Sequence, residues 1–209
     1  MIKNVIFDLG GVIYTFRPKE YLLKLGYNEA QVDLLVKRMF SGLWLEYDRG
    51  TYNRSSLIAK LCSDFPDMEK DFQQILGDDF VDNLINVMPP NLEFFYEVKQ
   101  RGFKIYILTN FFEDGFAHCR KRDDFFDDAD GIVVSAHEGL VKPEPAIYQV
   151  LLERYGLAPE DSLFIDDNEQ NVEAAKALGI YGIHFTSLED CKKQFEDLLR
   201  RVEISTHIQ

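Results

Sequence analysis

Short apolar runs alternate with helical patterns along most of the chain. Five runs rich in β-branched and aromatic residues predict strands at residues 5–7, 104–108, 131–135, 162–165 and 181–185. Because these runs are continuously apolar rather than alternating, we expect strands covered on both faces, as in a parallel sheet. Amphipathic stretches that end just before a glycine predict helices at residues 92–100, 143–155 and 169–178. This alternation predicts a doubly wound, Rossmann-like α/β fold with a mostly parallel five-stranded sheet.

One interval interrupts the alternation. Between Thr15 and about Val87 the sequence shows no convincing strand, and helical patterns cover residues 28–40, 54–65 and 79–87. Roughly 70 helical residues between the first two strands of the sheet predict an inserted helical bundle. We therefore expect an α/β core made of residues 1–15 and 88–209, with an all-helical cap made of residues 16–87.

The charge balance narrows the range of partners. Among 209 residues, 23 are Lys or Arg and 36 are Asp or Glu, which gives a formal net charge of −13. Because nucleic-acid backbones and anionic membranes both require clustered basic residues, neither is an expected partner. Hydrophobic residues make up 46% of the chain, which is enough for a packed core rather than disorder.

The cysteines favour a cytoplasmic location. Cys62, Cys119 and Cys191 are odd in number and far apart, which is typical of free thiols in a reducing compartment. The apolar run at the N-terminus is too short for a secretory signal, and no stretch approaches the ~20 apolar residues of a membrane span.

Polar side chains follow three of the predicted strands. Because the carboxyl ends of parallel strands meet at one edge of the sheet, we expect these residues to lie close together. Neighbouring carboxylates repel one another unless a cation lies between them, and Mg²⁺ binds carboxylates together with phosphate oxygens. The pattern indicates a metal-assisted site for phosphoryl transfer. Its residues are Asp8, Thr109, Asn110, Asp166 and Asp167, together with Lys142 just before a helix expected to begin at Pro143.

These residues lie in four segments that resemble the motifs of the haloacid dehalogenase-like hydrolases. The segments are FDLGGV at 7–12, LTN at 108–110, GLVKP at 139–143 and FIDDN at 164–168. Their order and spacing match that superfamily over nearly the whole chain, and the helical insertion lies where the superfamily has its cap. Gly10 and residues 47–50 also resemble the branch that contains α-D-glucose-1-phosphate phosphatase.

The resemblance implies a nucleophile and a metal site. Asp8 would attack phosphorus to form an aspartyl-phosphate, which water then hydrolyses. Asp8, Asp167 and the backbone carbonyl of Gly10 would hold Mg²⁺. Asp166 would either be a further ligand or orient the site. Asn171 is neutral where many relatives carry an acid, so it is expected to orient its neighbours or to lie on the helix surface.

The resemblance also implies how a phosphate ester is held. Thr109 and the backbone N–H of Asn110 would bind the phosphate oxygens, and Leu9 and Gly10 belong to the same substrate-binding set. Lys142 would neutralise the phosphate and restrain the nucleophile, and so would take part in both binding and catalysis.

Gly10 is a departure from the family pattern, since most phosphatases of the superfamily have an aspartate there that serves as general acid and base. Three interpretations stay open. The leaving group needs little protonation, as in a sugar 1-phosphate. Alternatively, another acid replaces the aspartate, with Glu46, Asp48, Glu113 and Asp114 as candidates. The third interpretation is a protein that binds phosphate esters but turns them over poorly.

The helical cap is expected to choose the substrate. Arg49 would bind a second anionic group, and Trp44 or Tyr47 would stack on a sugar face. Packing inside the bundle explains these two aromatic residues equally well. Phe111, Phe112 and Phe116 have the same two interpretations, as a narrowing of the entrance or as core.

The sequence therefore predicts an enzyme, a Mg²⁺-dependent phosphoric monoester hydrolase acting on a small phosphorylated metabolite, with sugar phosphates favoured. Without an acid at position 10, we expect slow turnover and an aspartyl-phosphate that accumulates. The alternatives are a catalytically impaired phosphate-ester-binding protein and a metal-independent haloacid dehalogenase. A receiver-type signalling domain fits less well, because that fold is shorter and its acceptor aspartate does not follow the first strand.

Overall fold

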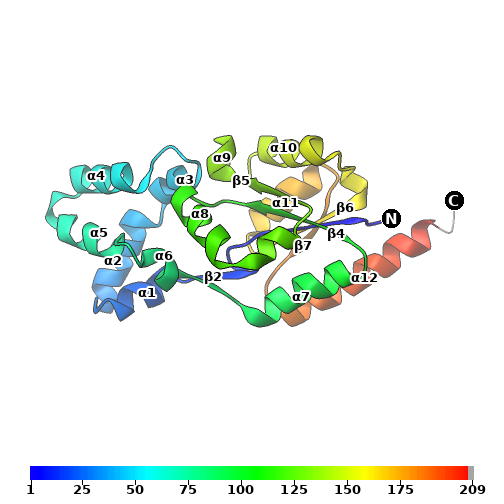
Figure 1. The fold of residues 1–209 in the computed structure, drawn as a ribbon, viewed down its shortest axis with the longest axis horizontal. Coiled ribbons are helices and arrows are strands. Elements are labelled where there is room, and N and C mark those ends of the chain that lie inside the picture. Colours follow the sequence, from blue (N-terminus) through cyan, green and yellow to red (C-terminus); the bar gives the residue numbers. More distant parts are fainter. Residues whose placement is uncertain (207–209) are drawn as a thin grey trace.

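A parallel five-stranded sheet lies at the centre of the computed structural model, which describes residues 1–206 (Figure 1). The strands lie in the order β5-β4-β1-β6-β7, so β1 is central. Phe7 pairs with Ile107 on one side and Ile165 on the other, which brings the carboxyl ends of these three strands together. The predicted fold class and all five strands are confirmed. The strands are β1 (Asn4–Phe7), β4 (Lys104–Thr109), β5 (Gly131–Val134), β6 (Ser162–Asp166) and β7 (Tyr181–His184).

Helices cover both faces of this sheet, which explains why its strands are continuously apolar. Ile6 belongs to a buried cluster on the face covered by α10 (Pro145–Tyr155) and α11 (Glu169–Ala177). Phe7, its neighbour in the strand, points to the opposite face and packs against Phe94. Successive residues of the strand therefore point to opposite faces of the sheet, and both faces are buried.

The opposite face is covered by α7 (Pro89–Gln100) and α12 (Leu188–Thr206), which run side by side in Figure 1. Their contact includes an edge-on pair of rings, Phe94 and Phe195, with centroids 5.7 Å apart. The helix expected from Pro143 begins instead at Pro145, because Glu144 is extended at the N-cap. At the other end of that helix, Gly156 has a φ of +63°, the left-handed conformation that ends helices at little cost.

The interval between the first two strands of the sheet is mainly helical, and its helices gather at one end of the molecule (Figure 1, left). Asn28 and Asn53 cap two of these helices, each by accepting a hydrogen bond from the backbone three residues later. The helices are α1 (Pro18–Lys24), α2 (Glu29–Met39), α3 (Gly42–Asp48), α4 (Arg54–Asp64), α5 (Glu69–Ile75) and α6 (Phe80–Leu84).

The expectation that this interval contains no strand is wrong at both of its ends. β2 (Tyr14–Phe16) pairs antiparallel with β3 (Ile85–Val87), and the helix predicted over 79–87 ends at Leu84. Thr15 Oγ1 accepts from the backbone N–H of Asn86 at 3.2 Å, which ties the two strands together across the whole insertion. Strands of three residues are too short to show a periodicity in the sequence.

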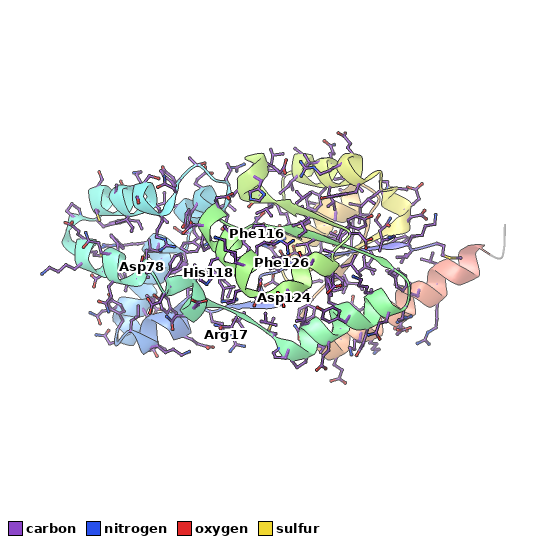
Figure 2. The ribbon with its side chains drawn as sticks, in the orientation of Figure 1. Arg17, Asp78, Phe116, His118, Asp124 and Phe126 are labelled. Atoms are coloured by element: carbon purple, nitrogen blue, oxygen red, sulfur yellow. The ribbon has the colours of Figure 1, made fainter. Side chains whose placement is uncertain are left out.

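The helical insertion also contacts the helix that follows β4. α8 (Glu113–Arg122) follows β4, and His118 on this helix contacts Asp82 of α6 at 2.7 Å. Phe116 of this helix, labelled with Phe126 in Figure 2, packs edge-on against that residue with ring centroids 5.4 Å apart. Within the described residues, no helix combines the length and apolar character needed to cross a membrane. The other elements are α9 (Ser135–Glu138) and the 3₁₀ turns η1 (Pro66–Met68), η2 (Asp124–Asp128) and η3 (Pro159–Asp161).

Candidate active site

A cavity of about 310 Å³ lies at the carboxyl ends of the central strands. It is the place where an open parallel sheet usually binds its ligand, because loops on either side of the central strand diverge there. Among the residues predicted for the site, those that line the cavity are Asp8, Leu9, Gly10, Thr109, Asn110, Lys142 and Asp167.

Lys142 is buried between two carboxylates. Its Nζ lies 2.7 Å from Asp8 Oδ1 and 2.7 Å from Asp166 Oδ2, and it donates to the backbone oxygen of Leu108 at 3.1 Å. Lys142 is 2% exposed, Asp8 is 7% exposed and Asp166 is fully buried. A lysine this deeply buried is stable only because its charge is fully paired.

Burial and mutual repulsion shift the pKa values of the groups in this cluster. The pKa of Asp8 is raised to about 7, chiefly by burial; the charge of Lys142 acts to lower it, and the charges of Asp166 and Asp167 act to raise it. Burial acts to lower the pKa of Lys142, but Asp166 and Asp8 hold it above its usual value. Partial burial raises the pKa of Asp167, and the charge of Asp166 raises it to a smaller extent. Three carboxylates with one lysine thus form a cluster that favours a further cation.

The acidic cluster has the composition and spacing of a divalent metal site. Oxygen atoms of Asp8, Asp166 and Asp167 all lie within 4.8 Å of one another. Asn171 donates from Nδ2 to both carboxylate oxygens of Asp166, at 3.0 and 3.1 Å, while its Oδ1 is buried and has no hydrogen-bond partner among the described residues. Carboxylates and an amide oxygen are the hard ligands that suit Mg²⁺ or its bound water, so these residues fit the metal.

Gly11 allows the first loop to approach Asp167. It has a φ of +71°, and a Cβ atom there would lie 2.0 Å from Asp167 Oδ2. Both the backbone conformation and the space therefore require glycine.

We expect Gly11→Ala to displace the Asp167 carboxylate and to weaken Mg²⁺ binding at least tenfold, an effect of about 1.4 kcal/mol or more. Calorimetric titration with Mg²⁺ measures this change. Gly139→Ala is the matched control, since Gly139 also has a left-handed φ, of +68°, but an added Cβ would meet nothing within 4 Å. Equal Mg²⁺ affinity in the two variants would contradict the assignment of the steric effect to Asp167.

Asn110 braces the loop that carries Lys142. Its Oδ1 accepts from the backbone N–H of Lys142 at 2.8 Å, and its Nδ2 donates to the backbone oxygen of the same residue at 3.0 Å. The side chain is therefore occupied, which is consistent with the expectation that only the backbone N–H of Asn110 contacts a phosphate. Thr109 lies at the end of β4, is 1% exposed and lines the cavity.

Of the four acids considered as replacements at position 10, Asp48 is the one that lines the cavity. Glu46 accepts hydrogen bonds from Arg49 and Thr51. Glu113 pairs with His137, and Asp114 pairs with Arg54 and accepts a hydrogen bond from Tyr47. The structure therefore separates Asp48 from the other three.

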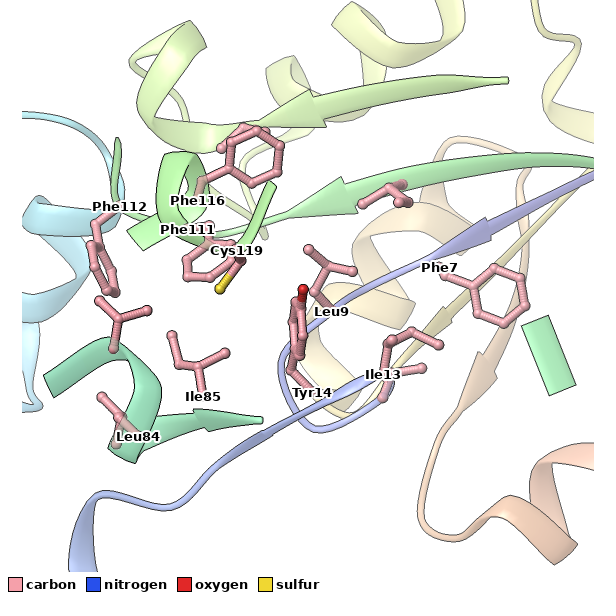
Figure 3. Close-up of a cluster of buried hydrophobic side chains, with 14 of the residues drawn as sticks. Phe7, Leu9, Ile13, Tyr14, Leu84, Ile85, Phe111, Phe112, Phe116 and Cys119 are labelled. Carbon is pink, nitrogen blue, oxygen red and sulfur yellow. The ribbon is translucent and has the colours of Figure 1, made fainter. Parts of the chain in front are cut away.

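The other half of the cavity is mainly aromatic. Figure 3 shows Tyr14, Ile85, Phe111 and Phe112 in the buried cluster beside the first loop. The residues on this side of the cavity are Tyr14, Phe16, Trp44, Ile85, Phe111 and Phe112. Tyr14, Phe16 and Ile85 come from the β2–β3 ribbon, and they are not among the predicted site residues because strands this short leave no pattern in the sequence.

Arg49 does not have the position expected for binding a substrate, and Tyr47 agrees with the packing interpretation rather than the stacking one. Arg49 forms a bidentate ion pair with Glu144, at 2.8 and 3.0 Å, and does not line the cavity. Tyr47 is fully buried and stacks on Phe112 with ring centroids 4.5 Å apart. A second anionic group on the substrate would therefore not meet a free Arg49.

Comparisons with known proteins identify the family of this chain. The sequence matches the model of a family described as haloacid dehalogenase-like hydrolase over residues 2–179. The sesquiterpene phosphatase astK of Aspergillus oryzae is 30% identical over 200 residues, which are 90% of this chain and 93% of that protein. The D-ribitol-5-phosphate phosphatase of Bacteroides thetaiotaomicron is 27% identical over 191 residues, which are 86% and 89% of the two chains. Two other curated relatives are longer proteins, of which the chain spans 19% and 37%.

The fold is shared with a haloacid dehalogenase family enzyme from Bacteroides thetaiotaomicron that was crystallised with magnesium and inorganic phosphate. The two structures have a TM-score of 0.67 and 22% sequence identity, over 88% of this chain and 93% of the other. The family model extends over most of the sequence, from the loop that carries Asp8 to the helix that follows Asp167. The chain therefore belongs to the haloacid dehalogenase-like hydrolases.

Proposed function

We propose that this hydrolase is a Mg²⁺-dependent phosphatase that acts on a small phosphorylated metabolite through an aspartyl-phosphate intermediate. The observation that carries the proposal is the cluster in which Asp8 is paired with buried Lys142 and lies within 4.8 Å of two further carboxylates. The two relatives named as phosphatases support the same reaction class.

Each predicted site residue has a role in this proposal. Asp8 is the nucleophile, and Lys142 restrains it and neutralises the phosphate. Asp8, Asp166, Asp167 and the Gly10 carbonyl are the proposed metal ligands, and a bound Mg²⁺ would supply positive charge to the phosphate oxygens. Thr109, with the backbone of Leu9, Gly10 and Asn110, would bind those oxygens.

The domain division also remains a proposal. Residues 16–87 would act as the cap over a core of residues 1–15 and 88–209, of which 207–209 lie outside the described residues. The location of the cavity supports this division, because the cap contributes Trp44 and Asp48 and the core contributes the charged cluster.

Two substrate classes fit the cavity. The resemblance around Gly10 favours a sugar phosphate, whose apolar ring face would pack on Trp44. The aromatic lining formed by Tyr14, Phe16 and Phe112 also favours a phosphate ester of an apolar alcohol. A phosphate-release screen with paired sugar and hydrocarbon monoesters, at equal concentration and with Mg²⁺, distinguishes the two classes by kcat/KM.

The partners and the location are proposed on the same basis. A small phosphorylated molecule, rather than nucleic acid or a membrane, fits a net charge of −13 combined with a single buried lysine in the cavity. The cytoplasmic location expected from the cysteines stays a prediction.

Metal removal separates a phosphatase from a metal-independent haloacid dehalogenase. We expect EDTA to abolish phosphate release and added Mg²⁺ to restore it. The affinity for Mg²⁺ should fall as the pH decreases below about 7, by up to about tenfold per pH unit, because protons compete for an Asp8 carboxyl whose pKa is raised to about 7. Calorimetric titrations with Mg²⁺ above and below that pH measure this dependence. Phosphate release that is unchanged in EDTA would contradict the metal dependence, and halide release from a haloacid in EDTA would favour the dehalogenase.

A further inference from the structure

The cap supplies one carboxyl group to the cavity beside the proposed nucleophile. Asp48 ends α3 and lines the cavity together with Asp8 and Lys142. The space next to Gly10 is open, since a Cβ atom added there would meet nothing within 4 Å. Position 10 of the first loop therefore lacks an acid, and the cap supplies one to the lining of the same cavity.

The backbone around Asp48 is fixed to the core by several contacts. Ser135 Oγ donates to the Asp48 backbone oxygen, and the neighbouring Arg49 forms its bidentate ion pair with Glu144. Gly50 has a φ of +83°, and an added Cβ would lie only 2.7 Å from the backbone oxygen of Ala136. Because none of these contacts uses the Asp48 carboxyl, the group is held in place yet remains available.

The surroundings of this carboxyl favour its protonated form. The pKa of Asp48 is raised to about 8, chiefly by burial. A hydrogen bond from the backbone of Phe112 and the charge of Lys142 act to lower this pKa, and the charge of Asp8 acts to raise it. A carboxyl group in such surroundings can hold a proton near neutral pH, as a general acid must.

We propose that Asp48 supplies the acid and base chemistry that Gly10 lacks, on the basis of the phosphatase function proposed above. Asp8 attacks phosphorus and the ester P–O bond breaks. The leaving oxygen keeps the bonding electrons and takes the proton from the Asp48 carboxyl, which releases the alcohol. Asp48, now a carboxylate, then accepts a proton from the water that attacks phosphorus. The bond from phosphorus to Asp8 breaks, and phosphate leaves.

Asp48→Asn tests this role, because it removes the proton while keeping the size and the backbone contacts of the residue. For glycerol 3-phosphate, whose leaving oxygen is strongly basic, we expect kcat to fall about 10²–10⁴-fold with little change in KM. The leaving group of p-nitrophenyl phosphate needs no proton. With this ester the variant should release a burst of one p-nitrophenol per enzyme molecule, followed by slow turnover. The burst would show a phosphoenzyme that forms but hydrolyses slowly.

Two further variants make the test decisive. Glu113→Gln, which changes an acid outside the cavity, should retain wild-type rates. Adding Gly10→Asp to the Asp48→Asn variant should raise its kcat at least tenfold, because the first loop has room for the new carboxyl group. Wild-type kcat in Asp48→Asn, a loss confined to KM, or a loss with neither burst nor rescue would overturn the role of Asp48 alone. A wild-type protein that releases no phosphate from any ester with Mg²⁺ would overturn the proposed function as well.

Discussion

Asp8→Asn is expected to lower phosphate release by at least about 10³-fold on every ester the wild-type protein hydrolyses, as the loss of a covalent nucleophile usually does. Asparagine has nearly the same size as aspartate and can still accept a hydrogen bond from Lys142, which also retains its pair with Asp166 at 2.7 Å. The variant should therefore fold. Phosphate release at saturating Mg²⁺ measures the activity, and thermal unfolding by circular dichroism checks the fold.

The covalent intermediate gives a second readout of the same substitution. Rapid quenching of the wild-type protein during turnover, followed by mass spectrometry of the peptide that contains Asp8, should find one added phosphoryl group. Asp8→Asn should show none. Glu113→Gln, which changes an acid outside the cavity, controls for general disturbance and should still become phosphorylated at Asp8. Activity within about tenfold of wild type in Asp8→Asn would contradict nucleophilic catalysis by this residue.

The central sheet and the residues at its strand ends could be predicted because their signal is local. Each strand is an uninterrupted apolar run, and parallel pairing necessarily carries residues such as Asp8, Thr109 and Asp167 to the same edge. The position of Lys142 follows a different rule, since it comes from a loop. The resemblance of four ordered segments to the family motifs indicated that Lys142 belongs to the site, and the structure shows an ion pair between Lys142 and Asp8.

The β2–β3 ribbon could not be predicted, for a physical reason. Each strand has three residues, and Thr15 meets a partner, Asn86, that lies 71 positions away. Nothing in either segment alone favours pairing over helix or loop, because their stability comes from the contact between them. Tyr14, Phe16 and Ile85, which the ribbon contributes to the cavity, were missed with it.

The sequence also could not show which of the candidate acids lies in the cavity. Glu46 and Asp48 are two residues apart on one short helix, yet one binds Arg49 outside the cavity and the other lines it. Arg49 in turn meets Glu144, 95 positions away, so its partner is set by how the cap meets the core. Residue type and spacing identify which groups are able to do chemistry, whereas tertiary contacts decide which of them are available.

Lys142→Met is expected to have the largest effect on stability, a loss of about 3–5 kcal/mol in the free energy of unfolding near pH 8 without metal, because it leaves buried carboxylates without their cation. Lys142 is paired with both Asp8 and Asp166, and methionine fills a similar volume without charge. The same substitution should abolish phosphatase activity, since the phosphate loses its buried lysine. Urea unfolding of the two proteins measures the difference in stability.

The pH dependence identifies the cause of this loss. The pKa of Asp8 is already raised on folding, from its ordinary value of 3.8 to about 7, so this group lowers stability as the pH rises through that range. Without Lys142 the folded-state pKa should rise further, and the stability deficit should be small near pH 5, where folding can proceed with a protonated carboxyl, and full near pH 8. Lys60→Met, which removes an exposed i,i+4 pair with Asp64, should cost less than about 1 kcal/mol at either pH. A deficit in Lys142→Met that is equal at both pH values would mean that lost packing, and not unpaired charge, destabilises the fold.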